Sequence, residues 1–153
     1  MATLISHSPE QTMALGEQWG QSARPGWIIG LSGELGSGKT QLVKGIARGL
    51  GIITRVLSPT FSLVHEYTAG RLPLAHLDLY RLETAEQIAR AGLEEYLLNP
   101  AGVTVVEWID RWPAWSAMSK AEESSTTPGR RRFVRLLCTG EQQRQIIYED
   151  LGD

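Results

Sequence analysis

One stretch decides the fold of this 153-residue chain: Gly33-Glu34-Leu35-Gly36-Ser37-Gly38-Lys39-Thr40. It matches the pattern G-x-x-x-x-G-K-[ST], in which glycines let a loop fold back and turn its backbone N–H groups toward a phosphate. The apolar run 27–32 before it suits a buried strand. After it, apolar residues recur on one helical face along 42–50, and Gly51 is placed to end that helix. Strand, glycine-rich loop and helix together predict a nucleotide-binding P-loop.

The residue types of the loop explain what it would bind. Backbone amides at the start of a helix attract anions, so the whole stretch 33–40 is predicted to bind nucleotide. Lys39 can reach the β- and γ-phosphates, and the hydroxyl of Thr40 can ligate Mg²⁺. The alternative is a glycine-rich turn with a solvated lysine. The flanking strand and helix favour the nucleotide site.

A P-loop site also needs an acidic residue from a neighbouring strand. The β-branched run 103–106 reads as a buried parallel strand and ends in Glu107, which could serve Mg²⁺ or polarise the attacking water. Asp78 competes for this role, but its segment, 72–79, alternates like a hairpin strand. We therefore favour Glu107. Ser58 and Thr60 could sense a γ-phosphate, although a local turn hydrogen bond is the more frequent use of such residues.

The remaining pattern predicts an α/β fold with a mixed sheet. Strands are expected at 3–6, 56–57, 61–67 and 72–79, and a C-terminal β-hairpin at 133–138 and 145–149. Helices are expected from Pro9, with Ser8 as N-cap, at 83–91 and at 92–98. Residues 117–130 are polar and predict a flexible loop, and the arginines at 130–132 read as a solvated charge run.

Bulk composition narrows the class of protein. The length suggests a single P-loop ATPase domain over 1–153. A net charge of −2 argues against a surface that binds nucleic acid unaided. There is one cysteine, Cys138, which we expect to be buried, and neither a secretory signal nor a run of membrane-spanning length. We expect a cytoplasmic protein with no membrane contact.

Four further motifs accompany the P-loop: Ser58-Pro59-Thr60-Phe61 with Leu63-Val64 and Tyr67, His76-Leu77-Asp78-Leu79-Tyr80-Arg81-Leu82, Gly92-Leu93-Glu94-Glu95-Tyr96, and Glu107-Trp108. In this order the segments resemble TsaE (formerly YjeE), a bacterial ATPase family of tRNA threonylcarbamoyladenosine synthesis. The resemblance is close over about residues 8–110.

The resemblance implies a P-loop NTPase fold with a mixed β-sheet flanked by helices, and ATP and Mg²⁺ as cofactors. Hydrolysis would be weak in the isolated protein. The partners would be TsaD and TsaB, which modify adenosine 37 of tRNAs that read ANN codons. Hydrolysis would reset that complex, and tRNA would be met only through it.

Carried over by position, Lys39, Glu107 and Asp78 would be catalytic, and Thr40 and Glu107 would serve the metal. The switch-like or partner-contacting positions would be Ser58, Thr60, Tyr80 and Trp108, and Thr12 would lie near the adenine. The segment after Trp108 departs from the family pattern, so hairpin contacts, including an arginine to the nucleotide, are not carried over.

Two other functions use the same loop. A small-molecule kinase would add an arginine-bearing lid and a substrate pocket, and only the arginines at 130–132 could imitate that lid. A nucleotide-gated binding module without significant turnover would resemble a slow ATPase in sequence. Partner-stimulated phosphate release separates the ATPase from both.

Overall fold

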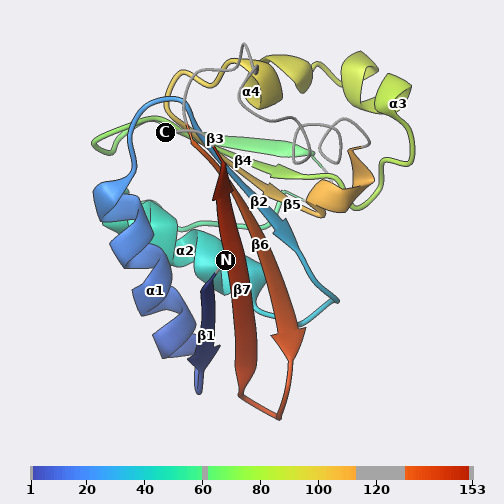
Figure 1. Cartoon of the computed structure of the whole chain (residues 1–153). Helices are drawn as coiled ribbons and strands as arrows, with labels where there is room; N and C mark the ends of the chain where they lie inside the picture. The colour runs from blue at the N-terminus through green and yellow to red at the C-terminus, as the bar shows by residue number, and fades with distance from the viewer. Residues whose placement is uncertain (1, 60–61, 113–129, 152–153) are drawn as a thin grey trace.

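A computed structural model describes residues 2–59, 62–112 and 130–151, and in these ranges a mixed sheet carries helices on both faces (Figure 1). The seven strands follow the order β1-β7-β6-β2-β5-β4-β3. They are β1 (Ala2–Ser6), β2 (Trp27–Ser32), β3 (Val64–Tyr67), β4 (Leu74–Asp78), β5 (Val103–Glu107), β6 (Arg131–Cys138) and β7 (Arg144–Leu151). The helices are α1 (Pro9–Ser22), α2 (Lys39–Gly49), α3 (Ala85–Arg90) and α4 (Glu94–Leu98), with a 3₁₀ turn η1 (Ile109–Arg111). The predicted α/β P-loop fold is confirmed.

Four neighbouring strands at the centre of the sheet run parallel. β2 pairs with β5 on one side and with β6 on the other, and β4 pairs with β5. All five residues of β5 are buried, as predicted for this strand. Parallel strands end at the same edge of a sheet, so the loop after β2 lies at the edge where β4, β5 and β6 also end.

The prediction for β4 was wrong in one respect. Its alternating sequence was read as a hairpin strand, and it does pair antiparallel with β3. However, β4 also pairs parallel with β5, with Asp78 opposite Glu107, and all its residues are buried. The polar residues His76 and Asp78 therefore face an interior site rather than solvent. A hairpin position of its strand is therefore no reason to place Asp78 behind Glu107 as the acidic residue of the site.

Helices α1 and α2 cover one face of the sheet, and α3 and α4 cover the other (Figure 1). Glycines let α1 and α2 approach closely: a Cβ atom added to Gly45 would lie 2.1 Å from the carbonyl oxygen of Met13. Helix α2 ends as predicted, with Gly51 at φ +81° and Ile52 N–H bonded to the Ala47 carbonyl. Close packing of these helices fixes the P-loop helix on the sheet.

The C-terminal hairpin is part of the main sheet. Strands β6 and β7 form the predicted antiparallel pair, and β6 adds parallel to β2. The solvated charge run predicted at 130–132 is wrong for Arg131 and Arg132, which are 3% and 8% exposed. Arg132 bonds Asp150 through Nε at 2.6 Å and Nη2 at 2.8 Å, and its guanidinium lies 4.6 Å from the ring centre of Trp19. These arginines are structural.

Three other expectations differ or stand outside the described residues. Residues 56–57 form no strand: residues 55–59 are irregular, and β3 begins only at Val64. Cys138, expected to be buried, is exposed at the end of β6. Thr60 and residues 117–129 of the predicted loop lie outside the described ranges. Within those ranges, no helix has the length and apolar character needed to cross a bilayer.

Candidate nucleotide site

Two glycines of the P-loop adopt the left-handed backbone conformation. Gly36 has φ +79° and Gly38 has φ +101°, a region that residues with a Cβ atom rarely adopt. Ser37 N–H closes the turn on the Glu34 carbonyl at 3.1 Å, and helix α2 starts at Lys39. The first N–H groups of a helix have no intrahelical acceptor, so this start provides donors for an anion.

Lys39 lies along the inside of this loop. Its Nζ donates to the carbonyl oxygens of Gly33 at 2.5 Å and Glu34 at 2.8 Å, and lies 3.4 Å from Ser37 Oγ. The side chain is buried, which lowers the pKa of Lys39, while the carboxylates of Glu107 and Asp78 act in the opposite direction. An arriving phosphate would favour the charged ammonium in the same way as these carboxylates.

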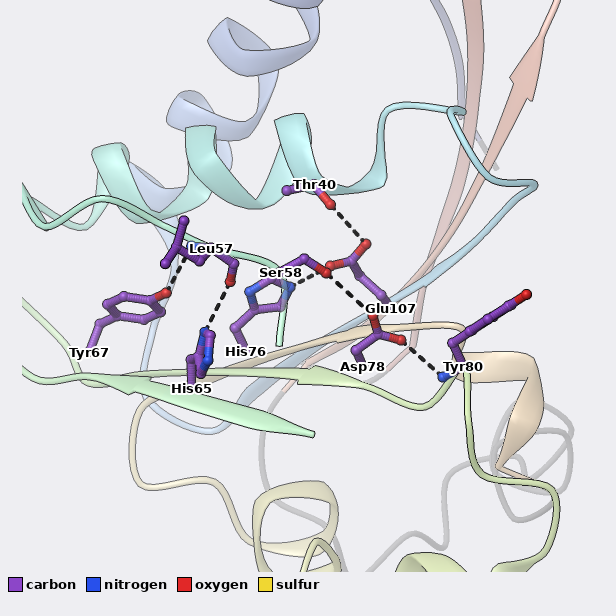
Figure 2. A network of polar contacts seen from close by, with 9 residues as sticks. All are labelled: Thr40, Leu57, Ser58, His65, Tyr67, His76, Asp78, Tyr80 and Glu107. Carbon is purple, nitrogen blue, oxygen red and sulfur yellow. Dashed lines mark hydrogen bonds and ion pairs between the residues drawn. The ribbon is translucent and has the colours of Figure 1, made fainter. Parts of the chain in front are cut away.

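Glu107 lies between α2 and the sheet with both carboxylate oxygens engaged (Figure 2). Thr40 Oγ1 donates to Oε1 at 3.2 Å, and His76 Nε2 lies 2.5 Å from Oε2. Glu107 is 3% exposed. The Thr40 hydroxyl and the Glu107 carboxylate are therefore close enough to bind the same metal ion.

Asp78 lies beside Glu107 at the end of β4 and has different partners (Figure 2). Ser58 Oγ donates to Asp78 Oδ2 at 3.4 Å, and the backbone N–H of Tyr80 donates to Oδ1 at 2.9 Å. The structure therefore brings Ser58 to the carboxylates of the site. Asp78 holds the segments that flank the site.

Trp108 and Tyr80 lie together at the mouth of the site. Their ring centres are 4.9 Å apart, and Lys39 Nζ lies 4.3 Å from the ring centre of Trp108. Trp108 adopts φ +60°, which is uncommon for a bulky residue and is often found at functional positions. The exposed Tyr80 ring and the strained Trp108 are placed to meet a ligand or a partner.

These residues line one pocket of about 430 Å³, a volume in the range of small-molecule sites. Predicted residues on its wall are Thr12, Leu35, Gly36, Gly38, Lys39, Thr40, Ser58, Asp78, Tyr80, Glu107 and Trp108. Gly33, Glu34 and Ser37 are not on the wall; they support Lys39 from behind. Thr12 lies on α1 and lines the pocket. It is 2% exposed and shares a hydrogen bond with Ser6 Oγ at 2.7 Å.

The donor set fits a nucleotide with Mg²⁺. Among the described residues, no group of three or more His, Cys, Asp or Glu side chains is arranged to hold a metal ion. Mg²⁺ in nucleotide sites commonly takes one or two protein ligands, with phosphate oxygens and water completing its shell. Thr40 and Glu107 could supply these protein ligands to Mg²⁺. Lys39 and the loop amides could bind the phosphates.

Comparison with known proteins agrees with this geometry. The family model described as threonylcarbamoyl adenosine biosynthesis protein TsaE matches residues 6–134. The chain belongs to the TsaE family. A TsaE from Bacillus subtilis is 37% identical over 146 residues, 95% of this chain and 84% of that protein. A TsaE from Synechocystis is 49% identical over 104 residues, 63% of this chain and 66% of that protein. The crystal structure of Bacillus subtilis YdiB superposes with a TM-score of 0.71 at 33% identity, over 96% of this chain and 83% of that one.

Two parts of the site in this TsaE family member were not predicted from its sequence. Arg144, at the start of β7, lines the pocket and donates from Nη2 to the Gly36 carbonyl at 3.0 Å. Nothing local identifies it, because its place depends on β6 pairing with β2. His76 was noted only as part of a motif. Its position two residues before Asp78 on one strand was a usable signal, since such residues share a face.

Proposed function

We propose that this chain is a Mg²⁺-dependent ATPase subunit of tRNA threonylcarbamoyladenosine formation at position 37 of tRNAs that read ANN codons. It would act with TsaD and TsaB, and hydrolysis would reset their complex. One observation carries the proposal: Thr40 Oγ1 lies 3.2 Å from Glu107 Oε1, next to a P-loop lysine, in a chain that belongs to the TsaE family. This role would place the protein in the cytoplasm.

The chemistry follows from the positions of the side chains. Bound Mg²⁺ would neutralise charge on the β- and γ-phosphate oxygens. The Lys39 ammonium and the loop amides would bind the same phosphates and stabilise charge that grows on the leaving group. Glu107 and Asp78 lie beside each other at the strand ends, where a carboxylate can orient an attacking water. Tyr80 and Trp108 would meet a partner at the mouth of the pocket.

The arrangement supports hydrolysis better than transfer to a metabolite. Two of the arginines that could have imitated a kinase lid, Arg131 and Arg132, are buried in β6, so this sequence feature no longer favours a kinase. Weak hydrolysis by the isolated chain would follow if a partner at Tyr80 and Trp108 had to complete the site.

Phosphate release from Mg-ATP tests the proposal. We expect slow release by the chain alone and at least about tenfold faster release with TsaD and TsaB, in line with groups supplied in trans. Lys39→Ala should abolish both, while Lys44→Ala, on α2 but outside the pocket wall, should behave as wild type. Threonylcarbamoyladenosine in tRNA, measured by mass spectrometry, should follow the same order.

Two results would contradict the proposal. Phosphorylation of a small-molecule acceptor without partners would point to a kinase. Tight ATP binding with no release in the presence of TsaD and TsaB would point to a binding module.

A further inference from the structure

His76 is a buried histidine that hydrogen-bonds the carboxylate of Glu107. The residue is 0% exposed, and its Nε2 lies 2.5 Å from Glu107 Oε2. It stands on β4 two residues before Asp78, so both side chains lie on the face of the sheet under α2 (Figure 2). The register that pairs Asp78 with Glu107 places His76 diagonal to Glu107. This is a cross-strand contact that long side chains can make.

The two ring nitrogens of His76 have different surroundings. Nε2 faces a carboxylate oxygen, which accepts, so Nε2 is the nitrogen that donates to Glu107. Nδ1 is buried and has no hydrogen-bond partner among the described residues, which costs free energy that an apolar side chain of similar size would avoid. Packing alone does not account for histidine here, whereas the hydrogen bond to Glu107 does.

That hydrogen bond restrains the one carboxylate that adjoins the P-loop hydroxyl. Without it, Oε2 would be buried without a hydrogen-bond partner among the described residues, and Glu107 could rotate away from Thr40. With it, Oε1 is kept toward Thr40, on the side of the pocket. Fixing Oε2 therefore orients Oε1.

We propose that His76 is a positioning residue that orients the Glu107 carboxylate toward Thr40 and the metal position. The inference rests on the proposed function only for its kinetic consequence. Its binding consequence, the gain in nucleotide affinity that Mg²⁺ provides, does not require hydrolysis.

Three variants test this inference. His76→Leu keeps bulk and removes the donor, His76→Gln keeps a side-chain N–H donor, and His65→Gln is the matched control. His65 lies on the adjacent strand β3 and contacts the Leu57 carbonyl rather than a carboxylate. Affinity for ATPγS is measured with Mg²⁺ and with EDTA, and kcat is measured with TsaD and TsaB at saturating ATP.

We expect all variants to bind ATPγS in EDTA within about twofold of wild type, because Lys39 and the loop are unchanged. His76→Leu should lose about tenfold of the affinity gained from Mg²⁺ and about 10- to 100-fold in kcat, the usual cost of removing a partner of a metal-binding side chain. His76→Gln should recover most of both losses. His65→Gln should show neither.

The inference fails if His76→Leu keeps both the Mg²⁺-dependent affinity and kcat, or if folded His76→Gln is as defective as His76→Leu. If His76→Leu lacks a cooperative melt, His76→Phe, which keeps a flat ring without a donor, takes the same test. A wild-type chain that binds Mg-ATPγS but releases no phosphate with its partners would refute the proposed function alone. The Mg²⁺-dependent affinity would still decide the role of His76.

Discussion

Two carboxylates with different partners meet at the phosphate end of the pocket. Glu107 is bonded to the P-loop residue Thr40 and to His76, whereas Asp78 is bonded to Ser58 and to the backbone of Tyr80. Glu107 is thus tied to the start of the P-loop helix. Asp78 is tied to the two segments that flank the pocket. The difference in partners suggests a division of roles between metal binding and control of the flanking segments.

Substitution of each carboxylate by its amide tests this division. We expect Glu107→Gln to bind nucleotide in EDTA within about threefold of wild type but to lose at least about tenfold of the affinity that Mg²⁺ adds. It should also lower kcat by about 10²- to 10⁴-fold, because a positioned acid-base group is lost. Asp78→Asn should lose less, about tenfold, since its contacts are to flanking segments. Steady-state phosphate release at saturating ATP with TsaD and TsaB measures kcat, and titration with ATPγS in Mg²⁺ and in EDTA measures nucleotide affinity. If Asp78→Asn were inactive while Glu107→Gln turned over normally, the two roles would be exchanged.

Elements differ in how far their sequence alone predicts them. The strand–loop–helix around Lys39 and the buried strand that ends at Glu107 are local patterns, and both were predicted correctly. The parallel partner of β4 was not, because alternation in a strand shows that its faces differ but not which strand lies beside it. Arg144 and the buried arginines of β6 were missed for the same reason. Their surroundings are set by pairing between segments about 100 residues apart in sequence.

The contact between helices α1 and α2 depends on glycine. A Cβ atom at Gly45 would lie 2.1 Å from the Met13 carbonyl oxygen, which is backbone and cannot move aside cheaply. We expect Gly45→Ala to destabilise the protein by about 2 kcal/mol or more, although alanine favours helix. Gln18→Ala, on the exposed side of α1, should stay within about 0.5 kcal/mol of wild type. Urea unfolding measures both, and equal stability of the two variants would contradict this packing.

The terminal hairpin should give stability that depends on pH. The hydrogen bond from Arg132 lowers the pKa of Asp150 from its ordinary value of 3.8. A lowered folded-state pKa adds stability above the unfolded value, and this stability is lost as the pH falls through the folded value. Because Asp150 is partly exposed to solvent, we expect Asp150→Asn to lower Tm at pH 7 by only about 2–4 °C.

The difference between Asp150→Asn and wild type should persist down to about pH 3.8 and shrink below it. Glu149→Gln, at the neighbouring exposed position, serves as control and should leave Tm unchanged. Thermal melts across this pH range provide the measurement. A difference that grew on acidification would have the wrong sign for a lowered pKa.

At the scale of the whole molecule, the sheet places the nucleotide pocket at one edge, and among the described residues three of the chain's 15 lysines and arginines are buried. Lys39 is buried in the P-loop, and Arg131 and Arg132 are buried in β6. The net charge is −2 and the isoelectric point is about 5.9. Phosphate backbones are held mainly by exposed lysine and arginine side chains. A net negative charge therefore accords with the proposed indirect role toward tRNA.

Binding to tRNA by the isolated chain tests this conclusion. We expect a Kd weaker than about 10 µM at physiological salt, because a chain with a net charge of −2 has no excess of positive charge to bind a phosphate backbone. Filter binding of labelled tRNA over a salt series measures it, and the same assay with TsaD and TsaB serves as the positive control. Arg132→Gln should not weaken retention further, since Arg132 is engaged with Asp150 and aromatic rings. Submicromolar retention that falls steeply with salt would show that the chain binds nucleic acid by itself, and the proposed indirect role toward tRNA would be wrong.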